Sequence, residues 1–145
     1  DQGLKESKMK KYILTTIRIL LGGILILYAY AKFSGNQFVK LELNENVDNI
    51  EPALLVFYFF GYSQTYAKFC AVAELITGLL TAIPRTSHIG VLIYFPFTLN
   101  IAVMDWCFDF PLETKLLISS LTLLSFLLIV ADWKFYMDVL VKKKS

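Results

Sequence analysis

The stretch that decides the fold is Tyr12–Phe33, which reads YILTTIRILLGGILILYAYAKF. Within it, only Arg18 and Lys32 carry a charge. A helix needs roughly 20 mainly apolar residues to cross the hydrocarbon core of a bilayer, which is about 30 Å thick. The stretch therefore predicts a membrane-spanning helix. Its small-residue end also imitates a secretory signal peptide, but Arg18 and the length of the apolar region favour an uncleaved helix.

Three further stretches satisfy the same requirement of length and composition. They lie near Gln64–Ile83, Ser87–Trp106 and Leu112–Ala131. Across all 145 residues, 57% are hydrophobic and 18% are charged, and the mean hydropathy is +0.59. A soluble domain averages about 45–50% apolar and about 25% charged residues. We therefore predict one domain with an all-α fold, an integral membrane bundle of four spanning helices.

Two shorter segments are expected to lie along the membrane surface. The apolar run Ala53–Ile83 is too long for one upright helix, and we expect it to break at residues 61–63 with Ser63 as a helix N-cap. Pro52–Phe60 is then too short to cross, so it is interfacial, with a shallow re-entrant piece as the alternative. Residues 133–143 combine apolar side chains with terminal lysines, which predicts an interfacial helix that binds anionic membrane lipid.

Charge is divided unequally between the two sides that four crossings create. One side carries ten basic and four acidic residues, a net charge of +6, and the other carries four basic and seven acidic residues, a net charge of −3. The first side holds both termini and Arg85, and the second holds the acidic segment Asn44–Asp48. Because basic residues concentrate on the cytoplasmic side, we expect both termini in the cytoplasm of a multi-pass protein of the bacterial inner membrane.

Short motifs in the first two spans resemble those of the DoxX-like family of small four-helix membrane proteins. The first span reads RILLG from Arg18 and AYAKF from Ala29, and the second reads ELITGLL from Glu74. Two positions depart from the family pattern. Ala29 stands where the family usually has glycine, and Ile83-Pro84 replaces a glycine that commonly closes the second span.

This resemblance implies a general class of function but no specific reaction or substrate. DoxX-like proteins are often membrane partners of redox systems, so we expect a redox-associated or partner-holding subunit that is not catalytic on its own. Its partner would be a soluble or membrane oxidoreductase. The alternatives are a quinone-linked oxidoreductase subunit and a small proton-coupled carrier that uses Glu74. The branch that assists disulfide formation carries Cys-x-x-Cys, which this sequence lacks.

Four polar residues are predicted to gather in the outer half of the bundle: Lys32, Glu74, Asn100 and Asp105. Helical side chains lean toward their own N-terminus, so Lys32 leans inward and Glu74 leans outward, and the two approach each other. Asn100 is expected to hydrogen-bond this pair. Arg18 leans toward the cytoplasm and is the poorer partner for Glu74. The alternative is that these helix faces only form the packing seam of the bundle.

Aromatic residues gather at the expected outer surface. Tyr58, Tyr62, Tyr66 and Trp106 are candidates for contact with lipid or with a quinone, the one cofactor that the sequence suggests. The alternative is the aromatic belt that membrane proteins commonly place at the interface. No other cofactor is predicted.

Gly22, Gly23 and Gly78 are expected to allow close helix packing, because small residues let membrane helices approach each other. These glycines could serve contacts inside the bundle or a homodimer.

Several classes of site are excluded or disfavoured by composition. A net charge of +2 argues against nucleic acid as a partner. Two cysteines and one histidine, His88, argue against a metal site, so none is predicted. Cys70 and Cys107 are expected at different depths, which makes a disulfide between them the minority interpretation.

Overall fold

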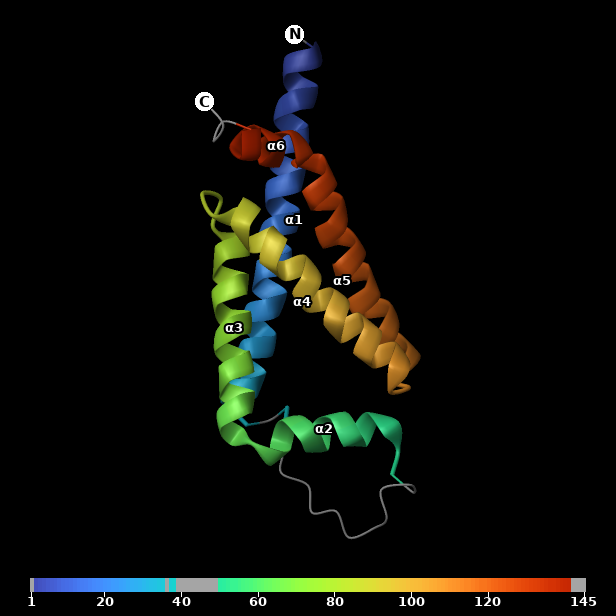
Figure 1. Ribbon diagram of the computed structural model, residues 1–145. Helices are drawn as coiled ribbons and strands as arrows, with labels where there is room; N and C mark the ends of the chain where they lie inside the picture. The colour runs from blue at the N-terminus through green and yellow to red at the C-terminus, as the bar shows by residue number, and fades with distance from the viewer. Residues whose placement is uncertain (1, 36, 39–49, 142–145) are drawn as a thin grey trace.

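The computed structural model describes residues 2–35, 37, 38 and 50–141. Six helices account for nearly all of them, and no strand occurs in these ranges. Their bounds are α1 Gln2–Phe33, α2 Pro52–Tyr62, α3 Gln64–Ala82, α4 Ser87–Cys107, α5 Leu112–Ala131 and α6 Trp133–Val141 (Figure 1). The expected acidic segment Asn44–Asp48 and the end of the C-terminal segment at residues 142–143 lie outside the described residues.

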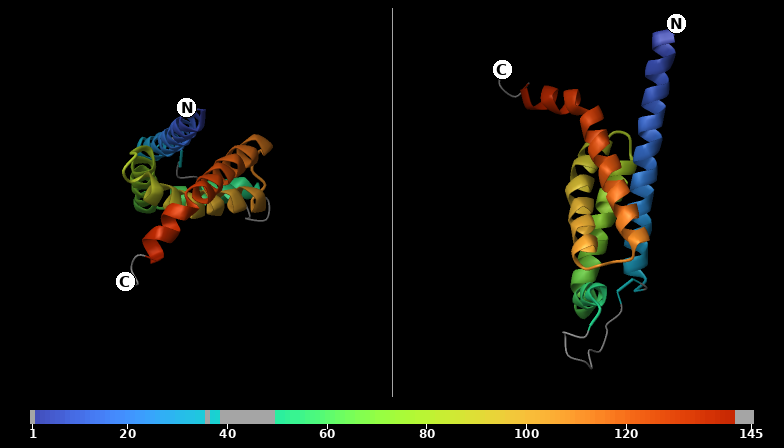
Figure 2. Two further views of the ribbon diagram at one scale, coloured as in Figure 1. Left: turned by 90° about the horizontal axis from the view of Figure 1, so that it is seen from above. Right: turned by 90° about the vertical axis from the view of Figure 1, so that its right-hand side faces the viewer.

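Four helices form an elongated bundle, and two short helices lie across its ends. The longest contact runs between α1 and α3, and α4 packs on both α3 and α5. At one end, α2 lies perpendicular to the bundle and is seen end-on in the side view (Figure 2). Both termini, the turn between α3 and α4, and helix α6 lie at the opposite end (Figure 1).

The membrane character of the chain follows from three of these helices. Each of α1, α4 and α5 is long and apolar enough to cross a membrane. Many of their large apolar side chains are exposed, including Leu27, Val103 and Leu123. The buried core comes from the same helices: Leu21, Leu25, Val91, Tyr94, Ala102, Ile118, Leu121 and Leu128. The structure is thus an all-α integral membrane protein by the length and composition of its helices.

Two helix ends differ from the expectations. Helix α1 begins at Gln2, ten residues before the predicted span, because the polar residues before Tyr12 continue the same helix. Helix α2 includes Gly61 and Tyr62, so the chain breaks at Ser63 alone. Ser63 has an extended backbone, and its hydroxyl accepts a hydrogen bond from the Tyr66 N–H at 3.3 Å. One well-placed cap is therefore enough to separate α2 from α3.

Close approach of α1 and α3 depends on two of the three predicted glycines. A Cβ on Gly22 would lie 2.5 Å from the Gly78 carbonyl oxygen, and a Cβ on Gly78 would lie 2.8 Å from the Gly22 carbonyl oxygen. Gly23 has open space where its Cβ would be. A further contact, which the sequence analysis missed, brings Gly90 of α4 against the backbone of Thr81, where a Cβ would be 2.3 Å away. Gly22 and Gly78 thus serve a contact inside the chain.

Candidate functional site

A buried ion pair joins α1 to α3 near the end of the bundle that α2 covers. The Lys32 ammonium donates to both carboxylate oxygens of Glu74, each at 2.7 Å. The two side chains are 7% and 3% exposed, so little solvent reaches the pair. They meet because the helices are antiparallel and each side chain leans toward its own N-terminus.

Aromatic rings surround the ammonium of this pair. The Lys32 Nζ lies 5.7 Å from the centroid of the Tyr28 ring and 5.4 Å from that of Phe38. The negative faces of aromatic rings attract a cation at such distances. The rings therefore supplement the Glu74 carboxylate in holding a positive charge away from water.

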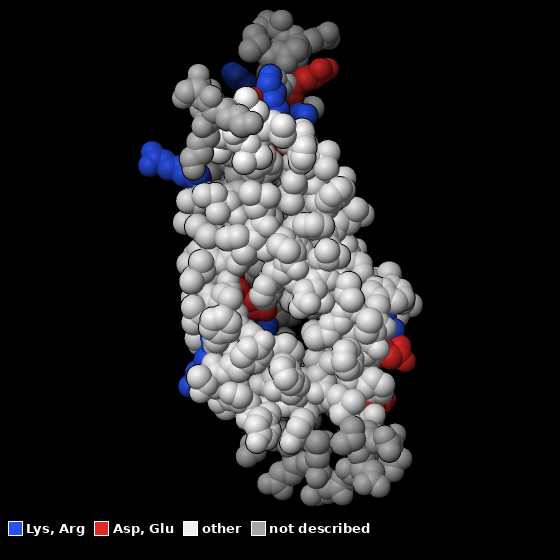
Figure 3. All heavy atoms as spheres, viewed as in Figure 1, with Lys and Arg blue, Asp and Glu red and all other residues white. Residues whose placement is uncertain are grey.

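A cavity of about 610 Å³ opens beside the pair and is covered by α2. All of α1 to α5 contribute to its wall. Eight aromatic residues line it: Tyr28, Phe38, Phe57, Phe60, Tyr66, Tyr94, Phe97 and Phe110. In the space-filling view, a hollow opens in a mostly uncharged surface, and acidic and basic atoms are visible inside it (Figure 3).

Ring contacts hold helix α2 against the open end of the cavity. Phe38 stacks on Phe60 with centroids 4.8 Å apart, and Phe57 lies 5.6 Å from Phe110 in the turn between α4 and α5. The backbone carbonyl of Phe38 also accepts a hydrogen bond from the Gln64 side chain at 3.4 Å. These ring contacts hold α2 in place, and no ion pair takes part in them.

Three side chains in the cavity wall have a buried polar atom without a partner in the described part of the chain: Gln37, Tyr94 and Asp105. Asp105 is 2% exposed and Tyr94 is fully buried. Neither the Asp105 Oδ2 nor the Tyr94 hydroxyl has a hydrogen-bond partner in the described part of the chain. Buried polar atoms are usually paired in native proteins, so an unpaired one calls for an explanation, and a ligand in the cavity supplies one.

Asp105 was predicted as part of the polar cluster, whereas Tyr94 was not. A signal for Tyr94 was present in the sequence. Tyr94, Thr98, Ile101 and Asp105 are spaced by four, three and four residues, which places them on one helix face, and all four line the cavity. This face of α4 is hard to recognise from the sequence, because Tyr94 is apolar enough to be taken for a core residue.

Asn100 does not play the role expected of it. It lines the cavity but is exposed, and no hydrogen bond joins it to Lys32 or Glu74. The prediction that Asn100 bonds the ion pair is therefore wrong. Its position, two residues after Thr98, turns its side chain away from the buried face of α4.

The four predicted aromatic contacts do not form one site. Tyr58, Tyr62 and Tyr66 border a smaller hollow of about 340 Å³ beside Phe59, and Tyr66 also lines the large cavity. Trp106 lies apart from both: its indole N–H donates to the Ser119 hydroxyl at 3.2 Å, and the Lys115 ammonium sits 5.3 Å from its ring. Lys115 also bonds Asp109 at 2.6 Å and holds the pKa of that carboxyl below its usual range.

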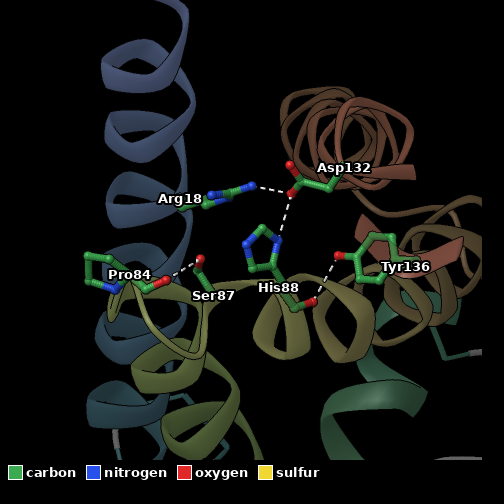
Figure 4. Close-up of polar contacts among 6 residues, drawn as sticks. All are labelled: Arg18, Pro84, Ser87, His88, Asp132 and Tyr136. Atoms are coloured by element: carbon green, nitrogen blue, oxygen red, sulfur yellow. Dashed lines mark hydrogen bonds and ion pairs between the residues drawn. The ribbon is translucent and has the colours of Figure 1, made fainter. Parts of the chain in front are cut away.

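A second polar cluster, which the sequence analysis missed, lies at the opposite end of the bundle (Figure 4). Arg18 of α1 pairs with Asp132 at the end of α5, and the same carboxylate is 3.1 Å from the Nδ1 of His88. The Tyr136 hydroxyl of α6 donates to the His88 carbonyl at 2.9 Å. Burial raises the pKa of Tyr136, so its hydroxyl stays protonated as a donor. The cluster joins four helices.

Neither a metal centre nor a disulfide is present among the residues that the structure describes. No group of three or more histidine, cysteine, aspartate and glutamate side chains there could hold a metal ion. Cys70 and Cys107 are both free thiols. The cavity beside the ion pair, with three unpaired polar groups in its wall, is the candidate site.

No family model matches the chain, and no solved structure matches it. The uncharacterized protein YwoB of Bacillus subtilis (strain 168) is 32% identical over 125 residues, which cover 84% of this chain and 81% of YwoB. This chain belongs to the YwoB family. Because YwoB is itself described as uncharacterized, membership brings no activity with it.

Proposed function

We propose that the chain is a bacterial inner-membrane protein with four crossings and both termini in the cytoplasm. The three apolar helices α1, α4 and α5 account for three crossings, and we assign the remaining crossing to α3. Helix α3 has 19 residues and is therefore about 28 Å long, close to the thickness of the hydrocarbon core. Its charged residues Lys68 and Glu74 reduce its hydropathy, but the Lys32 ammonium neutralises Glu74. Its long contact with α1 also supports an upright position.

Within this topology, the protein holds a small lipid-soluble molecule in the cavity under α2. The observation that carries the proposal is a cavity of about 610 Å³ with a mainly apolar wall, which includes eight aromatic residues and a few polar groups. Ligand pockets are typically about 300–1,000 Å³ and have this composition. A protein of this kind serves as a partner-holding or redox-associated subunit, the role that its resemblance to DoxX-like proteins implies, and it need not be catalytic on its own.

A quinone-linked oxidoreductase subunit is the second candidate. The eight aromatic residues in the wall support it, because a flat ring packs well against aromatic side chains. The proton-coupled carrier has less support, because the Glu74 carboxylate already accepts both of its short hydrogen bonds from Lys32.

The test is to extract the protein with its native lipids and identify the small molecules that remain bound. An Ala53→Trp variant fills the cavity from α2, where the side chain is half-buried. We expect a bound molecule in the unaltered protein that is lost in this variant. Tyr62→Trp on the same helix is the matched control, because Tyr62 is exposed and outside the large cavity.

Recovery of the same molecules from both variants, or none from the unaltered protein, would contradict the proposal. A quinone that only Ala53→Trp removes would establish the second candidate. Co-purification of an oxidoreductase in the same extract would support the redox-associated role.

A further inference from the structure

We propose that the cavity selects a lipophilic organic cation, with Asp105 as its counter-ion. This inference rests on the proposed binding function and names the class of ligand. The ionisable side chains of the cavity wall are the first observation that supports it. Five ionisable aliphatic side chains line the cavity: Lys32, Glu51, Glu74, Asp105 and Asp109. One is basic and four are acidic, so acidic groups outnumber basic ones in the wall.

Two of the four carboxylates are already neutralised. Lys32 bonds Glu74 at 2.7 Å, and Lys115, from outside the cavity, bonds Asp109 at 2.6 Å. Within the described ranges, no basic side chain forms an ion pair with Asp105 or Glu51. Asp105 is the buried member of these two, and a buried charge is stable only when it is paired. A cation in the cavity would pair it.

The aromatic wall favours the same ligand. Its rings already hold one cation, because the Lys32 ammonium lies 5.4 Å and 5.7 Å from the centroids of Phe38 and Tyr28. Cation–π attraction strengthens when the cation is desolvated.

The position of the cavity requires the rest of the ligand to be apolar. The surface around the hollow in Figure 3 is mostly uncharged. The lining is mainly apolar side chains, among them Leu25, Ile101 and Leu121. A ligand that fits both features carries one positive charge on a body of rings or hydrocarbon.

The experiment compares three probes of similar size and different charge. They are tetraphenylphosphonium, which is a permanent cation, triphenylphosphine oxide, which is neutral, and tetraphenylborate, which is an anion. Binding to the full-length protein in lipid nanodiscs is measured by equilibrium dialysis, with empty nanodiscs subtracted. We expect the cation to bind at least about tenfold more tightly than the neutral probe, and the anion to show no binding above the empty nanodiscs.

Asp105→Asn removes the counter-ion with almost no change of shape. It should weaken binding of the cation at least about tenfold and leave binding of the neutral probe unchanged. Because no hydrogen bond to the Asp105 side chain is lost among the described residues and the shape is nearly unchanged, the variant should fold. Glu51→Gln, at an exposed position of the wall, should weaken cation binding by a smaller factor. Asp138→Asn, exposed on α6, is the matched control and should bind as the unaltered protein does.

Equal affinity for the cation and the neutral probe overturns this inference and leaves the proposed binding function standing. The same conclusion follows if Asp105→Asn binds the cation as tightly as the unaltered protein does. If none of the three probes binds, and native extraction also yields no bound molecule, the proposed function fails together with the inference. The comparison of probes on the unaltered protein needs no variant, so the result does not depend on whether Asp105→Asn folds.

Discussion

At the scale of single residues, burying the charges of Lys32 and Glu74 carries a large desolvation free energy. A carboxylate at the centre of a membrane helix costs about 2.5–3.5 kcal/mol on the insertion scale. Two short bonds from the Lys32 ammonium offset much of that cost, and the nearby Tyr28 and Phe38 rings add cation–π attraction. The two charges stabilise each other in the buried site, and removing one of them would leave the other buried without a partner.

We therefore expect non-additive effects when the pair is removed. Lys32→Met and Glu74→Gln should each destabilise the protein, with Lys32→Met, which leaves a buried carboxylate, costing about 3–5 kcal/mol. The double variant should be less destabilised than the sum of the two, because it leaves no buried charge unpaired. Thermal unfolding in detergent measures all three variants.

Lys68→Met is the control for this cycle, because Lys68 is on the same helix and exposed. It should leave the unfolding temperature nearly unchanged. Additive losses in the double variant would show that Lys32 and Glu74 act independently, and the pairing argument would then be wrong.

At the scale of helices, the contact between α1 and α3 depends on close backbone approach. Gly22→Ala and Gly78→Ala each introduce a Cβ within 3 Å of a backbone carbonyl oxygen on the other helix. Backbone atoms cannot give way as a flexible side chain does, so the helices must separate. We expect each substitution to cost about 1–3 kcal/mol, as overpacking of a core does.

The neighbouring Gly23 provides the comparison, because its Cβ would meet nothing within 4 Å. Gly23→Ala should be neutral or stabilising by up to about 1 kcal/mol, since alanine is the better helix former. Denaturation in mixed detergent compares the three variants. Equal stability of all three would remove the support for a close contact at Gly22.

Helix α6 should be released when the second polar cluster is broken. Asp132→Asn removes the carboxylate that receives Arg18 and His88, leaving the Tyr136 hydroxyl as the polar contact to α4. Hydrogen bonds to charged groups contribute about 1.5–3 kcal/mol. The open population of α6 should therefore rise by at least about tenfold.

Tryptic cleavage after Lys134, which is exposed at the start of α6, reports on this opening. The rate should rise in Asp132→Asn and stay constant in Asp138→Asn, whose carboxylate has no partner among the described residues. Unchanged cleavage of Asp132→Asn would mean that other contacts, such as the stacking of His88 on Phe135 at 4.1 Å, hold α6 in place.

At the scale of the whole molecule, the two ends differ in charge and in what covers them. The end with both termini carries the exposed residue Arg85, and the other end carries Glu51 beside α2. The proposed topology makes a direct prediction. In a variant with Cys70 and Cys107 replaced by serine, a cysteine at position 51 should react with an impermeant maleimide on intact cells, and one at position 85 should react only after permeabilisation. The opposite pattern would reverse the orientation.

The sequence by itself determined the all-α class and most of the helix bounds. The length and composition of the apolar stretches and the Ser63 cap are local signals, which do not depend on how the helices pack. Side-chain direction along a helix even anticipated the meeting of Lys32 and Glu74, because that meeting depends only on antiparallel helices and depth. The same reasoning was wrong for Asn100, because the rotation of α4 about its own axis is set by packing and not by depth.

Only the tertiary structure decided which polar groups share a cavity and which are held elsewhere. Tyr94 resembles a core residue in the sequence, yet its hydroxyl has no partner in the part of the chain that the structure describes, and it lines the same cavity as Asp105. Arg18 and Asp132 are separated by 114 residues, and no local pattern joins them. Their contact requires α1 and α5 to lie together and α6 to turn across the end, which is a property of packing between helices.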